Sequence, residues 1–117
     1  MRPNLLPATA ASTTCCSEPS AAGISTPDAE GLARCLKALA DPARIRLLSI
    51  IAAHAGGEAC VCDLIEPLGL SQPTVSHHLK VLTESGFVTR DKRGAWAYYT
   101  IRPAAIAHVV GHLQEHL

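Results

Sequence analysis

The feature that most constrains the fold is a pair of helical hydrophobic patterns separated by only three residues. The first pattern covers 60–68, the second covers 72–84, and the segment 69–71 between them reads Gly-Leu-Ser. A turn this short joins two helices that cross each other. In the second helix the apolar residues recur at helical spacing, which leaves its opposite face to polar side chains.

Two strand-like segments follow directly. Residues 87–90 and 97–101 are rich in aromatic and β-branched residues, and the connection 91–94 reads Asp-Lys-Arg-Gly. Strand patterns on both sides of a polar, glycine-containing connection predict a β-hairpin with a basic tip. Aromatic residues make up only 3% of the chain, so the core must be aliphatic, which suits a helical domain. Helix, turn, helix and basic hairpin in this order predict a mainly α winged helix-turn-helix.

Two helices are predicted before this unit and one after it. The first covers 28–40, and the last runs from Pro103 to about residue 116. Between the first helix and the helix-turn-helix, Asp41 caps a further helix and Pro42 occupies its first position. The apolar stripe of that helix is predicted to consist of Ile45, Leu48 and Ala52.

The N-terminal quarter of the chain has a different composition from the rest. Residues 1–27 are rich in Pro, Ala, Ser and Thr without any period, so we expect a flexible tail followed by one domain over 28–117. No apolar run approaches the roughly 18 residues of a membrane helix, and the start is too broken for a secretory signal. We therefore expect a cytoplasmic protein with no membrane partner. We also expect no enzyme, because no Cys–His–acid arrangement or phosphate-binding glycine loop is visible.

The polar face of the helix over 72–84 predicts contacts with DNA. Short polar and amide side chains reach base edges in a major groove, and basic side chains neutralise phosphates. The candidate base contacts are Gln72, Thr74, Ser76, His77 and His78. The candidate phosphate contacts are Lys80, Arg90, Lys92 and Arg93. The alternative interpretation is a solvated polar helix and a hairpin that only closes the core, with His78 packed against the hairpin.

The cysteines predict thiol chemistry. The chain has five of them, an odd number that argues against a disulfide framework. Cys35 falls on an apolar helix face and is expected in the core. Cys60 and Cys62 begin the helix over 60–68, where a helix N-terminus favours the thiolate form and soft ions find the ligands they prefer. On an ideal helix two residues so spaced point about 200° apart, so they converge only if Cys60 lies in a non-helical lead-in or the first turn is distorted.

Three segments resemble the ArsR–SmtB family of metal-sensing repressors. They are 38–44 (ALADPAR), 59–64 (ACVCDL) and 70–79 (LSQPTVSHHL). The resemblance covers roughly 28–102. It implies a homodimeric winged helix-turn-helix whose ion-free form binds a two-fold operator and releases it when a metal binds. It further implies dimerisation through 28–40 and 103–116, a wing over 87–102, and a recognition helix over Ser71–Lys80, which adds Ser71 to the DNA-binding residues.

The same resemblance identifies Cys60-x-Cys62 as a soft-metal motif. The position three residues after the second cysteine, where some arsenic sensors carry a third ligand, is Ile65 here, and Cys15-Cys16 in the tail would replace it. Three thiolates suit As(III) or Sb(III), and the chain looks most similar to arsenic-responsive members. Four thiolates would suit Cd(II), Pb(II) or Zn(II), and a thiol redox sensor on the same fold is a further alternative. The histidines of the last helix, among them His108 and His112, are expected to form a solvated face.

Overall fold

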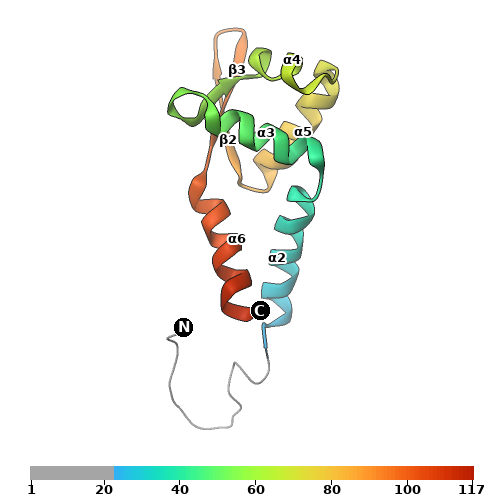
Figure 1. Ribbon diagram of the computed structural model, residues 1–117, viewed down its shortest axis with the longest axis vertical. Coiled ribbons are helices and arrows are strands. Elements are labelled where there is room, and N and C mark those ends of the chain that lie inside the picture. The colour runs from blue at the N-terminus through green and yellow to red at the C-terminus, as the bar shows by residue number, and fades with distance from the viewer. Residues whose placement is uncertain (1–22) are drawn as a thin grey trace.

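The computed structural model describes residues 23–117. In chain order its elements are α2 (Thr26–Leu39), α3 (Pro42–Ala53), the 3-10 turn η2 (Ala55–Gly57), β1 (Glu58–Cys60), the 3-10 turn η3 (Val61–Asp63), α4 (Ile65–Leu68), α5 (Gln72–Glu84), β2 (Val88–Arg93), β3 (Trp96–Ile101) and α6 (Pro103–His116). Helices α2 and α6 pack side by side and project from a body formed by the other elements (Figure 1). The mainly helical arrangement with a small sheet confirms the predicted fold class.

Side-chain caps start three of the helices, α2, α3 and α5. Ser25 caps α2, so this helix begins at Thr26, two residues before the predicted domain boundary. The Asp41 carboxylate accepts hydrogen bonds from the Ala43 and Arg44 amides at 2.8 and 3.4 Å, which confirms the predicted start of α3. Ser71 caps α5, whose bounds are those predicted.

The predicted helix over 60–68 is wrong in its first half. Residues 58–60 form strand β1, a 3-10 turn follows over 61–63, and only α4 is α-helical. The reason is that β1 pairs antiparallel with β3, with Cys60 opposite Tyr98, so these backbone groups are satisfied by a sheet. Gly69 then takes up a left-handed conformation, at φ 68°, and closes α4 ahead of the turn into α5.

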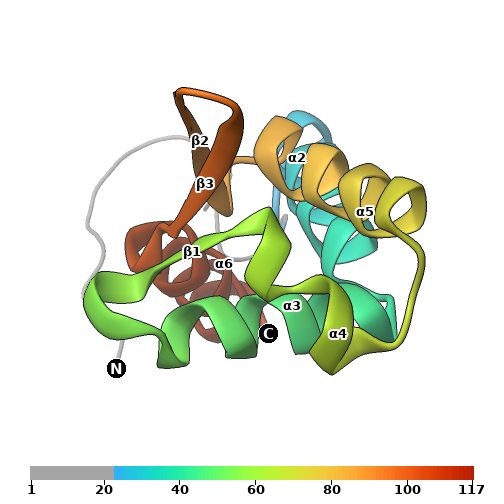
Figure 2. The ribbon, with the colours of Figure 1, turned by 90° about the horizontal axis from the view of Figure 1, so that it is seen from above.

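The hairpin is longer than predicted. Strands β2 and β3 pair antiparallel from Val88↔Ile101 to Arg93↔Trp96, and the sheet has the order β1-β3-β2. Asp91, Lys92 and Arg93 therefore belong to a strand, and the turn itself is Gly94-Ala95, with Gly94 at φ 63°. The hairpin and α5 stand on one side of the body, and α3 lies on the other (Figure 2).

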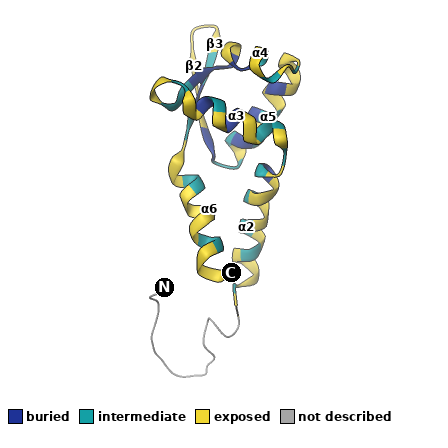
Figure 3. Cartoon of the chain, in the orientation of Figure 1, coloured by how far each residue is buried: buried dark blue, intermediate teal, exposed yellow. Residues whose placement is uncertain are grey.

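The core lies where α3, α5 and the sheet meet (Figure 3). Its fully buried side chains are Leu47, Ile51, Leu64, Val75, Leu79, Leu82, Phe87 and Val88. The predicted stripe of α3 is right at Leu48, which is buried, and wrong at Ile45, which is 55% exposed, and at Ala52, which is also exposed. The inward positions are Leu47, Leu48 and Ile51, because α3 packs against both α5 and β3. Of the helices described, none is long and apolar enough to cross a membrane.

Candidate DNA interface and thiol site

Helix α5 presents a polar face at the surface of the body. Gln72, Thr74, Ser76, His77 and Lys80 are all exposed, while Val75, Leu79 and Leu82 of the same helix are buried. The Ser71 hydroxyl lies 2.9 Å from the Thr74 hydroxyl and accepts from the Thr74 amide, so Ser71 serves first as the helix cap. A helix exposed in this way can enter a major groove and present amide, hydroxyl and imidazole groups to base edges.

His78 differs from its neighbours because it is half-buried and engaged with Arg44 of α3. The Arg44 Nη1 atom lies 3.2 Å from His78 Nδ1, and Arg44 Nε donates to the Ala38 carbonyl at 2.6 Å. A guanidinium has no acceptor, so this contact is a hydrogen bond only when His78 Nδ1 accepts and the ring proton sits on Nε2. The only donor that His78 can offer to DNA is then Nε2–H. The assignment of His78 to the bases stays a prediction.

The basic residues of the wing divide into two kinds. Arg90 and Lys92 are exposed, and within residues 23–117 neither side chain takes part in a hydrogen bond or an ion pair. Arg93 donates through Nη1 and Nη2 to both carboxylate oxygens of Glu58, at 2.9 and 2.6 Å, and through Nε to Asp91 at 3.0 Å. The hydrogen bond from Arg93 holds the pKa of Glu58 below its usual value, and Glu58 in turn raises the pKa of Arg93. Glu58 and Asp91 thus neutralise the charge of Arg93. Arg90 and Lys92 have no such partner among the described residues, so their side chains can bind phosphates.

Cys60 and Cys62 come together at the junction between strand and 3-10 turn. Cys60 has extended backbone angles (φ −75°, ψ 145°), and the Cys62 amide donates to Cys60 Sγ at 3.4 Å. The opposed directions expected on a regular helix therefore do not arise, because Cys60 lies in a non-helical lead-in. Among residues 23–117 no group of three or more His, Cys, Asp or Glu side chains is placed to hold a metal ion. The backbone thus brings the Cys62 amide against the Cys60 sulfur, and the assignment of both cysteines as metal ligands stays a prediction.

Two expectations about these thiols are corrected. A pair of metal ligands needs both sulfurs within reach of an ion, but only Cys62 is exposed, and Cys60 is just 3% exposed. A helix N-terminus was expected to favour thiolates, but the cysteines precede a single helical turn. A hydrogen bond with Cys60, assisted by partial burial and by the charge of Asp63, raises the pKa of Cys62. Cys62 is consequently a protonated thiol at neutral pH. Cys15 and Cys16, the other predicted ligands, lie outside the described residues.

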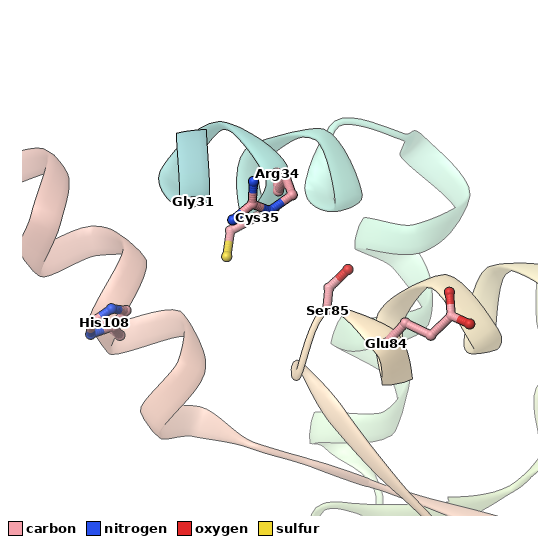
Figure 4. Close-up of a pocket in the computed structure, with 6 residues that line it drawn as sticks. All are labelled: Gly31, Arg34, Cys35, Glu84, Ser85 and His108. Carbon is pink, nitrogen blue, oxygen red and sulfur yellow. The ribbon is translucent and has the colours of Figure 1, made fainter. Parts of the chain in front are cut away.

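A cavity of about 400 Å³ opens between α2, the end of α5 and α6 (Figure 4). Cys35 is half-buried, packs against the core and points its sulfur from α2 toward this space. Its neighbours in the lining include Arg34, Glu84 and His108. Cys35 is therefore separated from the thiol pair, which sits on β1 and η3.

Helix α6 carries a row of histidines. The ring centroids of His108 and His112 are 4.4 Å apart, and those of His112 and His116 are 5.8 Å apart. His108 and His116 are exposed, as expected for a solvated face, but His112 is half-buried, and its Nδ1 has no hydrogen-bond partner among the described residues.

Comparison with known proteins agrees with this geometry. The family described as "Bacterial regulatory protein, arsR family" matches residues 41–90. The uncharacterized HTH-type transcriptional regulator MJ1325 of Methanocaldococcus jannaschii is 36% identical over 74% of this chain and 94% of its own. The arsenical resistance operon repressor of Staphylococcus aureus is 37% identical over 70% of this chain and 76% of its own.

The fold is shared as well. The crystal structure of the ArsR family transcriptional regulator RHA00566 superposes with a TM-score of 0.66 at 29% identity, covering 74% of this chain and 87% of that one. The sequence likeness spans most of the length of both relatives, and the structural likeness covers a similar share of the chain. The chain therefore belongs to the ArsR family of bacterial regulatory proteins and has its winged helix-turn-helix fold.

Proposed function

We propose that this chain is a homodimeric transcriptional repressor that binds operator DNA and releases it when its cysteines capture As(III) or Sb(III). The observation that carries the proposal is the apposition of Cys60 and Cys62 immediately before α4, the turn and α5. A change at this junction acts directly on the first helix of the DNA-reading unit. The relative from Staphylococcus aureus, named as an arsenical resistance operon repressor, supports the choice of ion.

DNA binding is assigned to the exposed face of α5 and to the wing. Gln72, Thr74, Ser76 and His77 would read base edges, with His78 offering its Nε2 proton. Lys80, Arg90 and Lys92 would neutralise phosphates and supply the salt-dependent part of the affinity.

Dimerisation is assigned to α2 and α6. Both helices project from the body and leave large apolar side chains uncovered, with Leu36 36% exposed and Val110 45% exposed. A second copy packed on the same surface would bury these residues by a two-fold, self-complementary contact. It would also place two recognition helices on one duplex, as a two-fold operator requires.

Ion capture is a condensation between thiols and arsenous acid. For each ligand, an S–H bond and an As–O bond break while an As–S bond and a molecule of water form. Cys60 and Cys62 would supply two sulfurs, and the tail segment Cys15-Cys16 would supply the third. Because Cys60 is buried, its sulfur has to leave the core to reach the ion, and this displaces the β1–η3 junction. By linkage, a state that the ion prefers must be a state that DNA disfavours.

The test is titration of arsenite into operator-bound protein, followed by fluorescence anisotropy of labelled DNA under reducing conditions. We expect operator affinity to fall by about 5–150-fold, the usual range for coupled sites. The Cys60→Ser/Cys62→Ser double variant should keep its operator affinity and lose the response. Cys35→Ser is the matched control and should respond like the wild type, since Cys35 lies in a different part of the body.

Three outcomes would redirect the proposal. A normal arsenite response in the double variant would contradict the site. Release by Cd(II), Pb(II) or Zn(II) but not by arsenite would assign the chain to divalent ions. Release only after a mild oxidant, with a disulfide found by mass spectrometry, would make it a redox sensor.

A further inference from the structure

We propose that Glu58 is a positioning residue that ties the wing to strand β1, and that loading of Cys60 and Cys62 reaches the wing through its contact with Arg93. This inference rests on the proposed function, because it describes how occupancy of the thiols affects DNA binding. Its parts are a carboxylate on the first strand, a guanidinium near the hairpin turn, and a tyrosine between them.

The first observation is how fully Arg93 is engaged. Its three nitrogen atoms donate to Glu58 and Asp91 at distances of 2.6–3.0 Å, and its guanidinium carbon lies 4.5 Å from the centroid of the Tyr98 ring. A bidentate pair fixes the orientation of the guanidinium, and stacking on an aromatic ring fixes its plane. Glu58 also accepts a hydrogen bond from the Thr100 hydroxyl at 3.2 Å, so the carboxylate is held in place on its own side.

The second observation is the register of the sheet. Glu58 is paired with Thr100 and Cys60 with Tyr98, two positions further along each strand. Side chains two apart on a strand share a face, and so do directly paired residues. Cys60, Glu58 and Tyr98 therefore lie on one face of the sheet, with Arg93 reaching across Tyr98 from the far strand. The cysteine and the guanidinium have the same tyrosine as their neighbour.

The third observation is that β1 is short. It has three residues, and it joins the thiols to Glu58 through a single intervening residue, Ala59. Ion capture requires the buried Cys60 sulfur to leave the core. Because β1 has only three residues and lies at the edge of the sheet, movement of one end of the strand also moves the other end. Displacement of β1 moves Glu58 with it, and the hydrogen bonds to Arg93 break or change partner. The wing is then no longer held at the angle to α5 that DNA binding needs.

The experiment uses Trp96 as the reporter of the wing. It is the one tryptophan of the chain, is 52% exposed, and is the register partner of Arg93. Its fluorescence emission and its quenching by iodide report on the hairpin alone. The full-length dimer is titrated with arsenite, with and without operator, and thiol loading is followed by the ultraviolet absorption of As–S bonds. The variants are Glu58→Gln and, as matched control, Glu66→Gln, which removes an exposed carboxylate on α4 that makes no ion pair among the described residues.

In the wild type and in Glu66→Gln, we expect arsenite to change the Trp96 signal in step with thiol loading. In Glu58→Gln the signal should already differ before arsenite is added, and loading should change it little further. The ratio of operator affinities without and with arsenite should fall from the wild-type value, about 5–150, toward one, while the affinity of the thiols for arsenite in the absence of DNA stays the same. A residue that only supported the fold would alter stability but would leave this ratio unchanged.

The failures of the two proposals can be told apart. If arsenite loads the wild type and releases the operator, but Trp96 does not respond or Glu58→Gln keeps the wild-type ratio, the role of Glu58 is refuted and the sensor stands. If arsenite loads the thiols and changes the Trp96 fluorescence but leaves the operator bound, the coupling of Cys60 to the wing is supported and the sensor is refuted. If arsenite does not load Cys60 and Cys62 at all, both are refuted.

Discussion

The pH dependence of thiol loading should distinguish arsenous acid from a divalent cation. Cys62 has a raised pKa, chiefly because of its hydrogen bond with Cys60, so near pH 7 it carries its proton. A divalent cation binds the thiolate and must expel that proton. Arsenous acid brings hydroxyl groups that leave as water with the thiol protons, so no net proton appears. The two kinds of ion should therefore differ in the protons they release.

The size of the pH effect on affinity follows from the number of protons that each ion releases. Each expelled proton makes the apparent affinity rise about tenfold for each unit of pH. For Cd(II) we expect at least one proton from Cys62 and therefore at least about a tenfold rise between pH 6 and pH 7. For arsenite we expect a change of less than about twofold over the same interval.

The assay is isothermal titration calorimetry of the DNA-free protein in two buffers of different ionisation enthalpy, which yields the number of protons released per ion. In Cys62→Ser the proton count for Cd(II) should fall by one. If Cd(II) binds to the wild type without releasing protons, Cys62 is already ionised, and the inference from its contact with Cys60 is refuted. If arsenite binding releases protons, the condensation scheme is refuted.

Three further predictions concern the wing and the stability of the fold. Lys92→Gln should reduce the slope of log affinity against log salt by about 0.9 for each phosphate that the side chain no longer neutralises, as operator titrations between about 50 and 200 mM salt would show; an unchanged slope would contradict the assignment of Lys92 to phosphates. Gly57→Ala should destabilise the protein by about 1 kcal/mol or more in urea unfolding, because residue 57 has φ +67° and its new Cβ would lie 3.0 Å from Ile101 Cγ2; an unchanged midpoint would contradict this. For Asp41, partial burial alone would raise the pKa, but the amide hydrogen bonds outweigh it and lower the pKa of the folded state below 3.8. The contribution of Asp41 to the free energy of unfolding is thus present above about pH 3.8 and is lost as the pH falls through the pKa of the folded state. Asp41→Asn should therefore lose less stability than the wild type on acidification.

Helix α5 could be predicted from the sequence because local signals agree there. Ser71 is a strong N-cap residue, proline follows in the first turn, and the apolar residues of α5 repeat at helical spacing. The buried face of the neighbouring helix α3 was harder to predict. Leu47, Leu48, Ile50 and Ile51 are all apolar, so the pattern does not select a face, and packing against α5 and β3 decides which side is buried.

The thiol site could be predicted only in part. The spacing of Cys60 and Cys62 indicated soft-ion ligands, but β1 was missed, because a three-residue strand has no periodicity of its own and exists only through its pairing with β3, about 40 residues later in the chain. Glu58 was missed for the same reason. Its alternation with Cys60 is visible in the sequence, yet nothing local shows that Arg93 and Tyr98 lie beside it. Contacts between residues so far apart depend on tertiary structure.

The shortness of β1 also limits how the proposed ion site can evolve. On a strand, a shift of the cysteine by one position, to residue 59, would turn the sulfur to the opposite face, away from Tyr98, and a shift by two would replace Glu58. Neither step preserves both the ligand and its neighbours. The 3-10 turn after position 60 does not alternate its side chains between two faces as a strand does. We therefore expect the position of the second cysteine to vary among related sequences. The cysteine at position 60 should stay in place.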